Sequence, residues 1–443
     1  MITDATGDGR SVDPVRTLVI VVRADPIICG HATEARNLAE AALDLGVERV
    51  HIVTYPLDVL AQSSLPLKPI DRILPYSEGI VVDRPAPMGD YKVLDGRLSL
   101  AIGGRIIDIL RTNPGPTIVM ELYLVPHGQM VLDAVRALDT PAERLDVTTI
   151  GEAVGSDITN VVRNAVAEGR VGAAQMVLST FLAHDVPVAV SVYTRELIAE
   201  AATEVDRILG TDYAGRVERE VGISYPAIDT AKFTTIDERP HEVDTVLERR
   251  GLERDGFVLF LSRVAPAKGV DDLVAAYRAS ALRRKIPLVI CGTGPALGEI
   301  RELAAEDPDI RSFDDVDDDE KLALMHACTA YALPSKPRPE FTETFGIAVA
   351  EKMLAGGPGP VITTSTGGLP EATGGHCLLH DPGDVDGLRA CLDEVAAMDR
   401  SARLAMSDAA RTYARRFDRR AVLERLLALA HEGRATGVVS AAG

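Results

Sequence analysis

Short apolar runs alternate along the chain with longer stretches in which apolar residues recur at helical spacing. The runs are rich in β-branched residues and have the length of strands, whereas the segments between them, such as 32–45, have the length of helices. The strand-like runs lie at 17–22, 49–54, 116–121, 145–150, 186–191, 257–262, 287–291, 331–335 and 361–365. Near-continuous apolar strands separated by helices are typical of parallel sheets covered by helices on both faces, so the predicted fold class is α/β.

A charged segment poor in strand-like residues, 233–256, interrupts this alternation and is the best candidate for a hinge between two Rossmann-like halves. The length of 443 residues also favours two or three domains. We expect domains at 1–235 and 236–405, and an amphipathic pattern at 402–432 predicts a final helix. Two such domains facing each other produce a cleft, and parallel sheets bind ligands beyond the carboxyl ends of their strands.

Charge and composition exclude several classes of partner. The formal net charge of −19 opposes binding to nucleic acid or to an anionic membrane. No apolar run approaches the roughly 18 residues of a membrane span, and the N-terminus does not resemble a signal peptide. The five cysteines lack CxxC spacing, which indicates buried reduced thiols rather than zinc or disulfides. We therefore expect a cytoplasmic protein, with the acidic run 313–322 forming a solvated loop and a helix start.

Two cations follow the strand-like run at 257–262. Arg263 and Lys268 stand in "RVAPAKG", in a strand-to-helix loop. A guanidinium and an ammonium beyond a strand end are suited to binding a diphosphate. The alternative is a solvated loop with ordinary surface charges.

Glycines follow two further strands. Gly294 lies in "GTGP" after 287–291, and Gly367 and Gly368 lie in "TGGLPE" after 361–365. Glycines let the backbone approach a ligand, or they only make the turn. In the second loop the glycine N–H groups would favour an anion, and Glu371 would stabilise the first turn of the helix that follows.

The stretch "EFTETFGIAVAEKM" (340–353) has carboxylates on both sides of a glycine turn that opens a helix. The N–H groups of Phe345, Gly346 and Ile347 would point toward an anion at that helix start. Glu351, about one turn inside, can accept hydrogen bonds from a ribose diol, and Glu343 can reach a sugar hydroxyl. Otherwise, Glu351 only interacts with the helix dipole and Glu343 is solvated.

Taken together, these four loops resemble the retaining glycosyltransferases of the GT4 family, which have the GT-B fold of two Rossmann-like domains. The motifs are Glu-x7-Glu after Pro-Ser, Gly-Gly-x-Pro-Glu downstream and Arg-x4-Lys-Gly upstream. The resemblance covers nearly the whole chain and is strongest at 257–375. It implies that residues 1–235 bind the acceptor, that 236–405 bind the nucleotide sugar, and that 406–443 hold a helix crossing back to the first domain, with a tail.

The resemblance also implies a role for each site residue. Arg263 and Lys268 would hold the donor diphosphate and neutralise the leaving group. Glu351 would bind the ribose, and Glu343 with the backbone of residues 345–347 would hold the donor sugar. The implied reaction is front-face transfer with retention of configuration, without a metal or other cofactor, in which stabilisation of the diphosphate charge is the largest protein contribution.

The N-terminal half departs from the family pattern at two places. The family's Gly-Gly loop is replaced by Cys29 and Gly30; Gly30 is a candidate for close approach to the diphosphate or acceptor, and His31 either contacts the acceptor or is a surface residue. Glu152, in "IGEAVG", replaces a histidine that touches the donor sugar near C6, which favours a specialised donor sugar. His127 and His184 are interpreted as structural or surface residues.

The leading hypothesis is therefore an enzyme that moves a sugar from a nucleoside diphosphate to a small polar acceptor. A sugar, an aminocyclitol, a sugar phosphate or a thiol would serve as acceptor, and the Ala- and Arg-rich composition makes bacterial secondary metabolism plausible. UDP, GDP and ADP donors remain open, as do the linkage and the formation of a homodimer. The alternatives are a sugar-nucleotide epimerase or a non-catalytic sugar-nucleotide-binding protein on the same fold.

Overall fold

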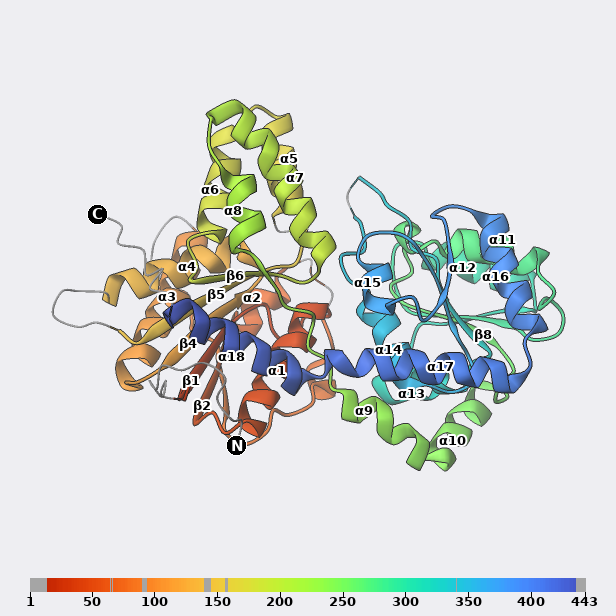
Figure 1. The fold of residues 1–443 in the computed structure, drawn as a ribbon. Helices are drawn as coiled ribbons and strands as arrows, with labels where there is room; N and C mark the ends of the chain where they lie inside the picture. The colour runs from red at the N-terminus through yellow and green to blue at the C-terminus, as the bar shows by residue number, and fades with distance from the viewer. Residues whose placement is uncertain are drawn as a thin grey trace, which may run out of the picture. The chain divides into compact units, whose positions relative to one another are not determined.

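The computed structural model describes residues 14–63, 65, 67–89, 94–138, 145–155, 158–339 and 341–435. The chain folds into two compact units, each built from a sheet and helices (Figure 1). The first unit comprises Met1–Val188, Ala199–Ser224 and Leu423–Gly443, and the second comprises Ala189–Ile198 and Tyr225–Val422. Each unit is therefore assembled from segments that are separated in the sequence.

The first unit contains a seven-stranded sheet with the order β3-β2-β1-β4-β5-β6-β7. Strands β3, β2, β1, β4 and β5 pair in parallel, as the continuous apolar runs predicted. The strands are β1 (Thr17–Val21), β2 (Arg49–Val53), β3 (Ile80–Asp83), β4 (Thr117–Leu122), β5 (Val147–Ala153), β6 (Val186–Ala189) and β7 (Gly222–Ile223). Because β2 and β4 flank β1, the strand order reverses between β1 and β4.

Helices cover this sheet, and α5, α6 and α8 stand together to one side of it (Figure 1). The helices are α1 (Gly30–Asp44), α2 (Leu57–Ala61), α3 (Leu94–Thr112), α4 (Leu124–Leu138), α5 (Thr159–Ala167), α6 (Val171–Phe181) and α8 (Tyr213–Glu220). Buried apolar side chains of β1, β4, α3 and α4 form one core cluster. No described helix has the length and apolar content needed to cross a bilayer.

The second unit contains a six-stranded parallel sheet with the order β10-β9-β8-β11-β12-β13. The strands are β8 (Val258–Leu261), β9 (Leu288–Cys291), β10 (Ile310–Phe313), β11 (Ala330–Leu333), β12 (Val361–Thr364) and β13 (Leu378–His380). The strand order reverses between β8 and β11. In open parallel sheets, ligands bind beyond the carboxyl ends of the strands at such a reversal.

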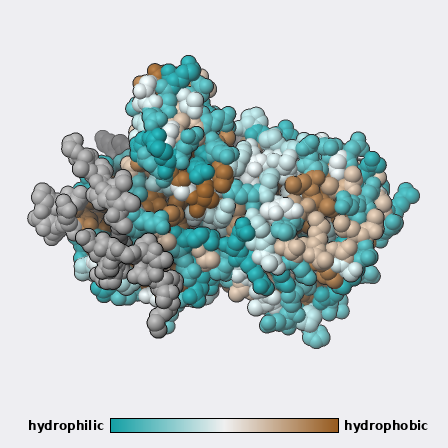
Figure 2. Space-filling view, viewed as in Figure 1, coloured by the Kyte–Doolittle hydropathy of each residue, from teal (hydrophilic) through white to brown (hydrophobic). Residues whose placement is uncertain are grey.

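The helices of the second unit surround this sheet and bury one large apolar core. They are α9 (Thr230–Thr234), α10 (Pro240–Arg250), α11 (Val270–Ala279), α12 (Leu297–Glu306), α13 (Asp318–Ala327), α14 (Ile347–Ala355), α15 (Leu369–Thr373), α16 (Val385–Ala397) and α17 (Arg400–Ala414). Two further helices, α7 (Val192–Leu209) and α18 (Arg419–Ala435), contribute residues to both units. Hydrophilic residues cover most of the visible face of each unit (Figure 2).

Residues 233–256 are a folded part of the second unit and not a linker. Most of the segment forms α9 and α10, and α10 buries Val243, Val246 and Leu247 in the core. The charged residues that suggested a hinge occupy the remaining faces of α10. The expected boundaries at 235/236 and 405/406 both lie inside the segment Tyr225–Val422.

The predicted final helix is divided into α17 and α18 by a short 3-10 helix, Arg415–Phe417. At this break the Ile228 N–H donates to the Phe417 carbonyl, and the Arg419 N–H donates to the Ile228 carbonyl. The ring of Phe417 packs edge-to-face against Phe345 and Tyr225, with centroids 4.9 and 5.3 Å away. This aromatic cluster explains why the second unit begins at Tyr225 and extends past residue 406.

Candidate active site

The loops after β8 and β11 bring two of the predicted residues together at the strand-order reversal of the second unit. The Lys268 ammonium forms an ion pair with the Glu343 carboxylate. Each side chain is only 14% exposed, so this pair is not the solvated surface arrangement that was the alternative. The ammonium also lies 4.7 Å from the centroid of the Phe341 ring. A cation and a carboxylate therefore stand where the fold is expected to bind a ligand.

Arg263 lies in the same loop as Lys268, but its environment differs. The residue is exposed, and it forms no ion pair with any other described residue. Its guanidinium is therefore available to a ligand as an uncompensated positive charge. Because Glu343 balances Lys268, Arg263 supplies the net charge of this loop.

Helix α14 begins directly after a glycine turn, as the sequence predicted. Gly346 has φ of 103°, and a Cβ there would lie 2.5 Å from Leu369 Cδ2, so glycine is required. Within the described part of the chain, the N–H groups of Phe345, Gly346 and Ile347 donate to no protein acceptor. Such amides at a helix N-terminus form an anion site. The Phe345 side chain points instead into the core, so only its backbone could contact a ligand.

Glu351 is buried one turn inside α14, where its carboxylate pairs with the Lys321 ammonium from α13. Burial, followed by the charges of Glu351 and Glu343, raises the pKa of Tyr331 well above its usual value. Both glutamates therefore lie close enough to one buried tyrosine to affect its ionisation. Lys321, which the sequence gave no reason to select, holds Glu351 in the ligand-free protein.

Gly294 lets the backbone of its loop pack closely against the neighbouring loop. Its φ is 155°, and a Cβ would lie 2.2 Å from the Val264 carbonyl oxygen. The Val264 N–H also donates to the Thr293 carbonyl over 2.9 Å. The loop after β9 thus packs directly on the loop that carries Arg263. The structural interpretation of this glycine is supported, and its contact with a donor stays a prediction.

The loop after β12 differs from the expectation of a second anion site. The Gly368 N–H donates to the Glu343 carbonyl over 2.9 Å, and α15 is only five residues long. Glu371 does not stabilise the first turn of α15 through its carboxylate. That group instead accepts the Val192 N–H at the start of α7, at 2.9 and 3.0 Å. These polar groups therefore hold the Glu343 loop and residues 189–198 in place.

The predicted residues of the first unit lie at the carboxyl ends of its strands. Gly30 is exposed at the start of α1, and His31 is largely enclosed, with its ring 5.6 Å from that of Tyr123. Glu152 is fully buried in β5. His127 and His184 are buried, so they are not surface residues. The His31 ring lies against Tyr123 and is partly buried, and its contact with an acceptor stays a prediction.

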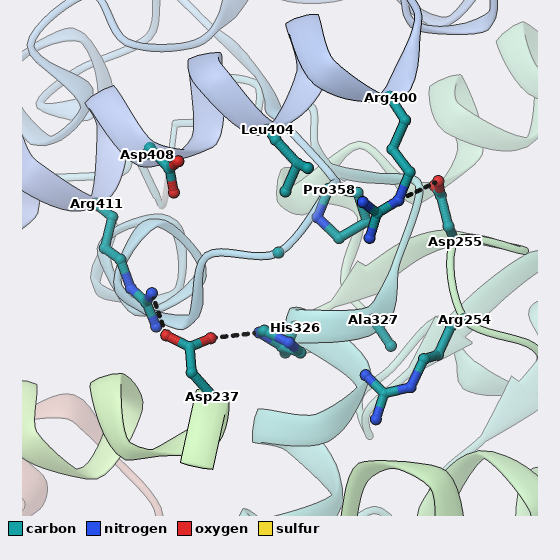
Figure 3. Close-up of a pocket in the computed structure, with 11 residues that line it drawn as sticks. Asp237, Arg254, Asp255, His326, Ala327, Pro358, Arg400, Leu404, Asp408 and Arg411 are labelled. Carbon is teal, nitrogen blue, oxygen red and sulfur yellow. Dashed lines mark hydrogen bonds and ion pairs between the residues drawn. The ribbon is translucent and has the colours of Figure 1, made fainter. Parts of the chain in front are cut away.

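A cavity of about 240 Å³ in the second unit lies away from all of these loops (Figure 3). Its lining residues Asp255, Ala327 and Pro358 precede β8, β11 and β12, so it lies at the amino ends of the strands. Asp237 stands between Arg411 and His326 and pairs with both. The charged groups that line the cavity are thus largely paired with one another, and the cavity does not coincide with the predicted site.

Comparison with known proteins places the loops of the second unit within one family match. Residues 246–413 match the family described as Glycosyl transferases group 1. This match lies within the second unit and contains Arg263, Lys268, Glu343 and Glu351. The segment 246–413 therefore belongs to the group 1, GT4-type glycosyltransferases. The chain's two Rossmann-like units have the GT-B fold, as the resemblance implied.

Curated relatives of the chain are moderately similar to it. It is 28% identical over 210 residues to O-antigen chain mannosyltransferase B of Escherichia coli, covering 45% of this chain and 53% of the relative. It is 26% identical over 343 residues to a GDP-mannose-dependent α-(1-6)-phosphatidylinositol monomannoside mannosyltransferase of Mycobacterium tuberculosis, covering 75% and 80%. The alignments to the E. coli protein and to the Mycolicibacterium smegmatis mannosyltransferase span less than two thirds of those relatives, 53% and 58%.

Solved structures share the fold along most of the chain. Anabaena Alr3699/HepE in complex with UDP-glucose superposes with a TM-score of 0.64 at 14% identity, covering 95% of this chain and 99% of that one. A trehalose-phosphate synthase from Burkholderia xenovorans gives 0.67 at 11% identity, covering 94% and 100%. At these identities the likeness establishes the fold alone.

Proposed function

We propose that this chain transfers a sugar from a nucleoside-diphosphate sugar to a small polar acceptor, with retention of configuration and without a metal. The observation that carries the proposal is the Lys268–Glu343 pair, which stands beside the free amides of α14 at the strand-order reversal. The family match over residues 246–413 contains all of these groups.

Each part of the donor then has a partner in the second unit. Arg263 and Lys268 bind the diphosphate and stabilise the negative charge that grows on it as the sugar bond breaks. The amides of residues 345–347 add partial positive charge at the same place. Glu343 holds a sugar hydroxyl, and Glu351 accepts hydrogen bonds from the ribose.

The proposed donor is GDP-mannose. This choice is supported by the curated relatives, among which are GDP-mannose-dependent mannosyltransferases. The structural neighbour from Anabaena was solved with UDP-glucose, so UDP donors form the competing choice. The acceptor carries at least one nucleophilic hydroxyl, amine or thiol.

Melting temperatures measured with UDP, GDP, ADP and dTDP test the site. A nucleotide present at 100 times its dissociation constant adds roughly 2.7 kcal/mol to the free energy of unfolding. GDP is expected to give the largest shift, and a larger shift with UDP would reject the GDP-mannose proposal. If none of the four raises the melting temperature, the site assignment is wrong.

Turnover in the presence of a chelator tests the chemistry. We expect hydrolysis or transfer of GDP-mannose to persist in excess EDTA and to disappear in Glu343→Ala, while nucleotide binding is retained. Equal turnover in Glu343→Ala would argue against the assigned role of this carboxylate. Nucleotide binding without any turnover in the wild-type protein would favour a sugar-nucleotide sensor.

A further inference from the structure

Arg23 lies at the strand-order reversal of the first unit. It follows β1, and its guanidinium carbon stands 4.2 Å from the centroid of the Tyr123 ring, which follows β4. Strands β1 and β4 are neighbours at the point where the order of this sheet reverses (Figure 1). Ligands of open α/β sheets bind beyond the strand ends at such a point.

The charge of Arg23 has no partner among the described residues. It is partly buried, its Nε atom is inaccessible and makes no hydrogen bond, and no carboxylate forms an ion pair with it. Of the other cations nearby, Arg36 and Lys68 share the Asp25 carboxylate, and Arg84 donates to the carbonyl oxygens of Tyr55 and Asp25. A partly buried guanidinium without a counter-ion is unfavourable in the free protein, so binding of an anion to it would be favourable.

Three titratable groups near Arg23, those of His31, His127 and Tyr55, are neutral at physiological pH. Burial, with a smaller contribution from the Arg23 charge, lowers the pKa of His31 to about 4 and that of His127 to about 3. The Tyr55 hydroxyl lies 2.9 Å from His127 Nε2, and burial raises the pKa of Tyr55 to about 12. Arg23 therefore adds a positive charge beside three neutral polar side chains.

The backbone of Tyr123 is held in an unusual conformation. Its φ of 135° is one that residues with a side chain rarely adopt, and its N–H donates to Glu121 Oε2 over 3.0 Å. This conformation places the ring face against the guanidinium. Backbone conformations of this kind persist where the surroundings enforce them, often at binding sites.

We propose that Arg23, with its plane supported by Tyr123, binds the phosphate or carboxylate of an anionic acceptor substrate. This inference rests on the proposed function and narrows its acceptor to molecules that carry an oxyanion. The forked guanidinium pairs with two oxygens of such a group, and the neighbouring Tyr55 hydroxyl and His31 ring supply neutral polar contacts.

Calorimetric titration of the intact protein with inorganic phosphate tests the site. We expect saturable binding that weakens at least tenfold in Arg23→Met and changes less than twofold in Arg163→Gln. Arg163 is a matched control because it is exposed on the same unit and pairs with Glu200. Arg23→Lys, which keeps the charge and loses the fork, is expected to fall between the two.

Nucleotide-induced melting shifts separate a failure of this inference from a failure of the proposed function. They should be unchanged in Arg23→Met, which also shows that the variant folds. Phosphate binding that is absent in the wild type, or is lost in Lys268→Met and kept in Arg23→Met, would overturn the inference. A hexose phosphate and a hexuronate, each compared with the uncharged hexose, then distinguish a phosphate-bearing from a carboxylate-bearing acceptor; equal affinity for all three would also overturn it.

Discussion

Lys268 and Glu343 neutralise one another in the ligand-free protein, so each is stabilising only while the other is present. With side chains 14% exposed, neither can be fully hydrated if its partner is removed. On the proposed function, the diphosphate of the donor offers Lys268 an alternative anion. The free energy of the ion pair would then contribute to the binding equilibrium as well as to folding.

Lys268→Met should lower the free energy of unfolding by about 1–3 kcal/mol, because the Glu343 carboxylate is left largely buried without a cation. In the double variant Lys268→Met, Glu343→Gln, part of this loss should be recovered, with a coupling of about 0.5–3 kcal/mol in urea denaturation. Arg301→Gln removes an exposed pair with Asp314 and should cost less than about 1 kcal/mol. Additive single effects would show that the pair does not interact.

Partners of single residues were the least predictable part of the site. The sequence identified Glu343 and Lys268 from their places after strands, and it identified the glycine that opens α14. It gave no indication that Lys321 would pair with Glu351, or that Arg23 and Tyr123 would meet, because each pair joins residues far apart in the chain. Pairing of this kind depends on tertiary packing and leaves no local pattern.

The loops that follow the strands were predictable as elements, because buried parallel strands are continuous apolar runs and glycines mark their ends. The helix α10 was not predictable in this way. Arg249, Arg250 and the neighbouring acidic residues make its sequence mostly charged, and the apolar stripe that it buries is short. The acidic run 313–322 contains the start of α13, as expected, and Asp317 and Glu320 form a capping box there. Its Glu320 is not solvated, however, because it pairs with both of those arginines.

Two glycines four residues apart should respond oppositely to substitution by alanine. Gly294→Ala places a Cβ 2.2 Å from the Val264 carbonyl at a φ of 155°, so we expect a loss of roughly 1–3 kcal/mol. Gly298 lies in α12 with nothing within 4 Å of a Cβ, and Gly298→Ala should stabilise the helix by about 0.5–1 kcal/mol. Thermal or urea denaturation measures both. A neutral Gly294→Ala would mean that the two loops are not in contact.

The two units of the whole molecule have separate cores and should respond separately to acid. His127 and His184 are fully enclosed in the first unit, and burial lowers the pKa of each to about 3. An unfolded chain binds protons at these histidines near pH 6.5, so the stability they contribute is complete above that pH and declines as the pH falls.

Between pH 7 and pH 5, each of these histidines should reduce the stability of the first unit by at most about 2 kcal/mol. Urea denaturation of the wild type and of His127→Gln at both pH values measures the difference. The variant should lose less stability on acidification than the wild type. An equal loss in the two proteins would show that His127 is already accessible to protons in the folded state.

The discontinuous make-up of the first unit has a consequence for biosynthesis. Helix α18 buries Leu423, Leu426 and Ala430, and this part of the helix belongs to the first unit. All seven strands of that unit's sheet precede residue 224. On the ribosome, the first unit therefore stays incomplete, with the apolar surface that α18 covers exposed, while the whole of Tyr225–Val422 is translated. The second unit should therefore mature first, and the first unit should depend on chaperones for longer, although most of it is translated before Tyr225.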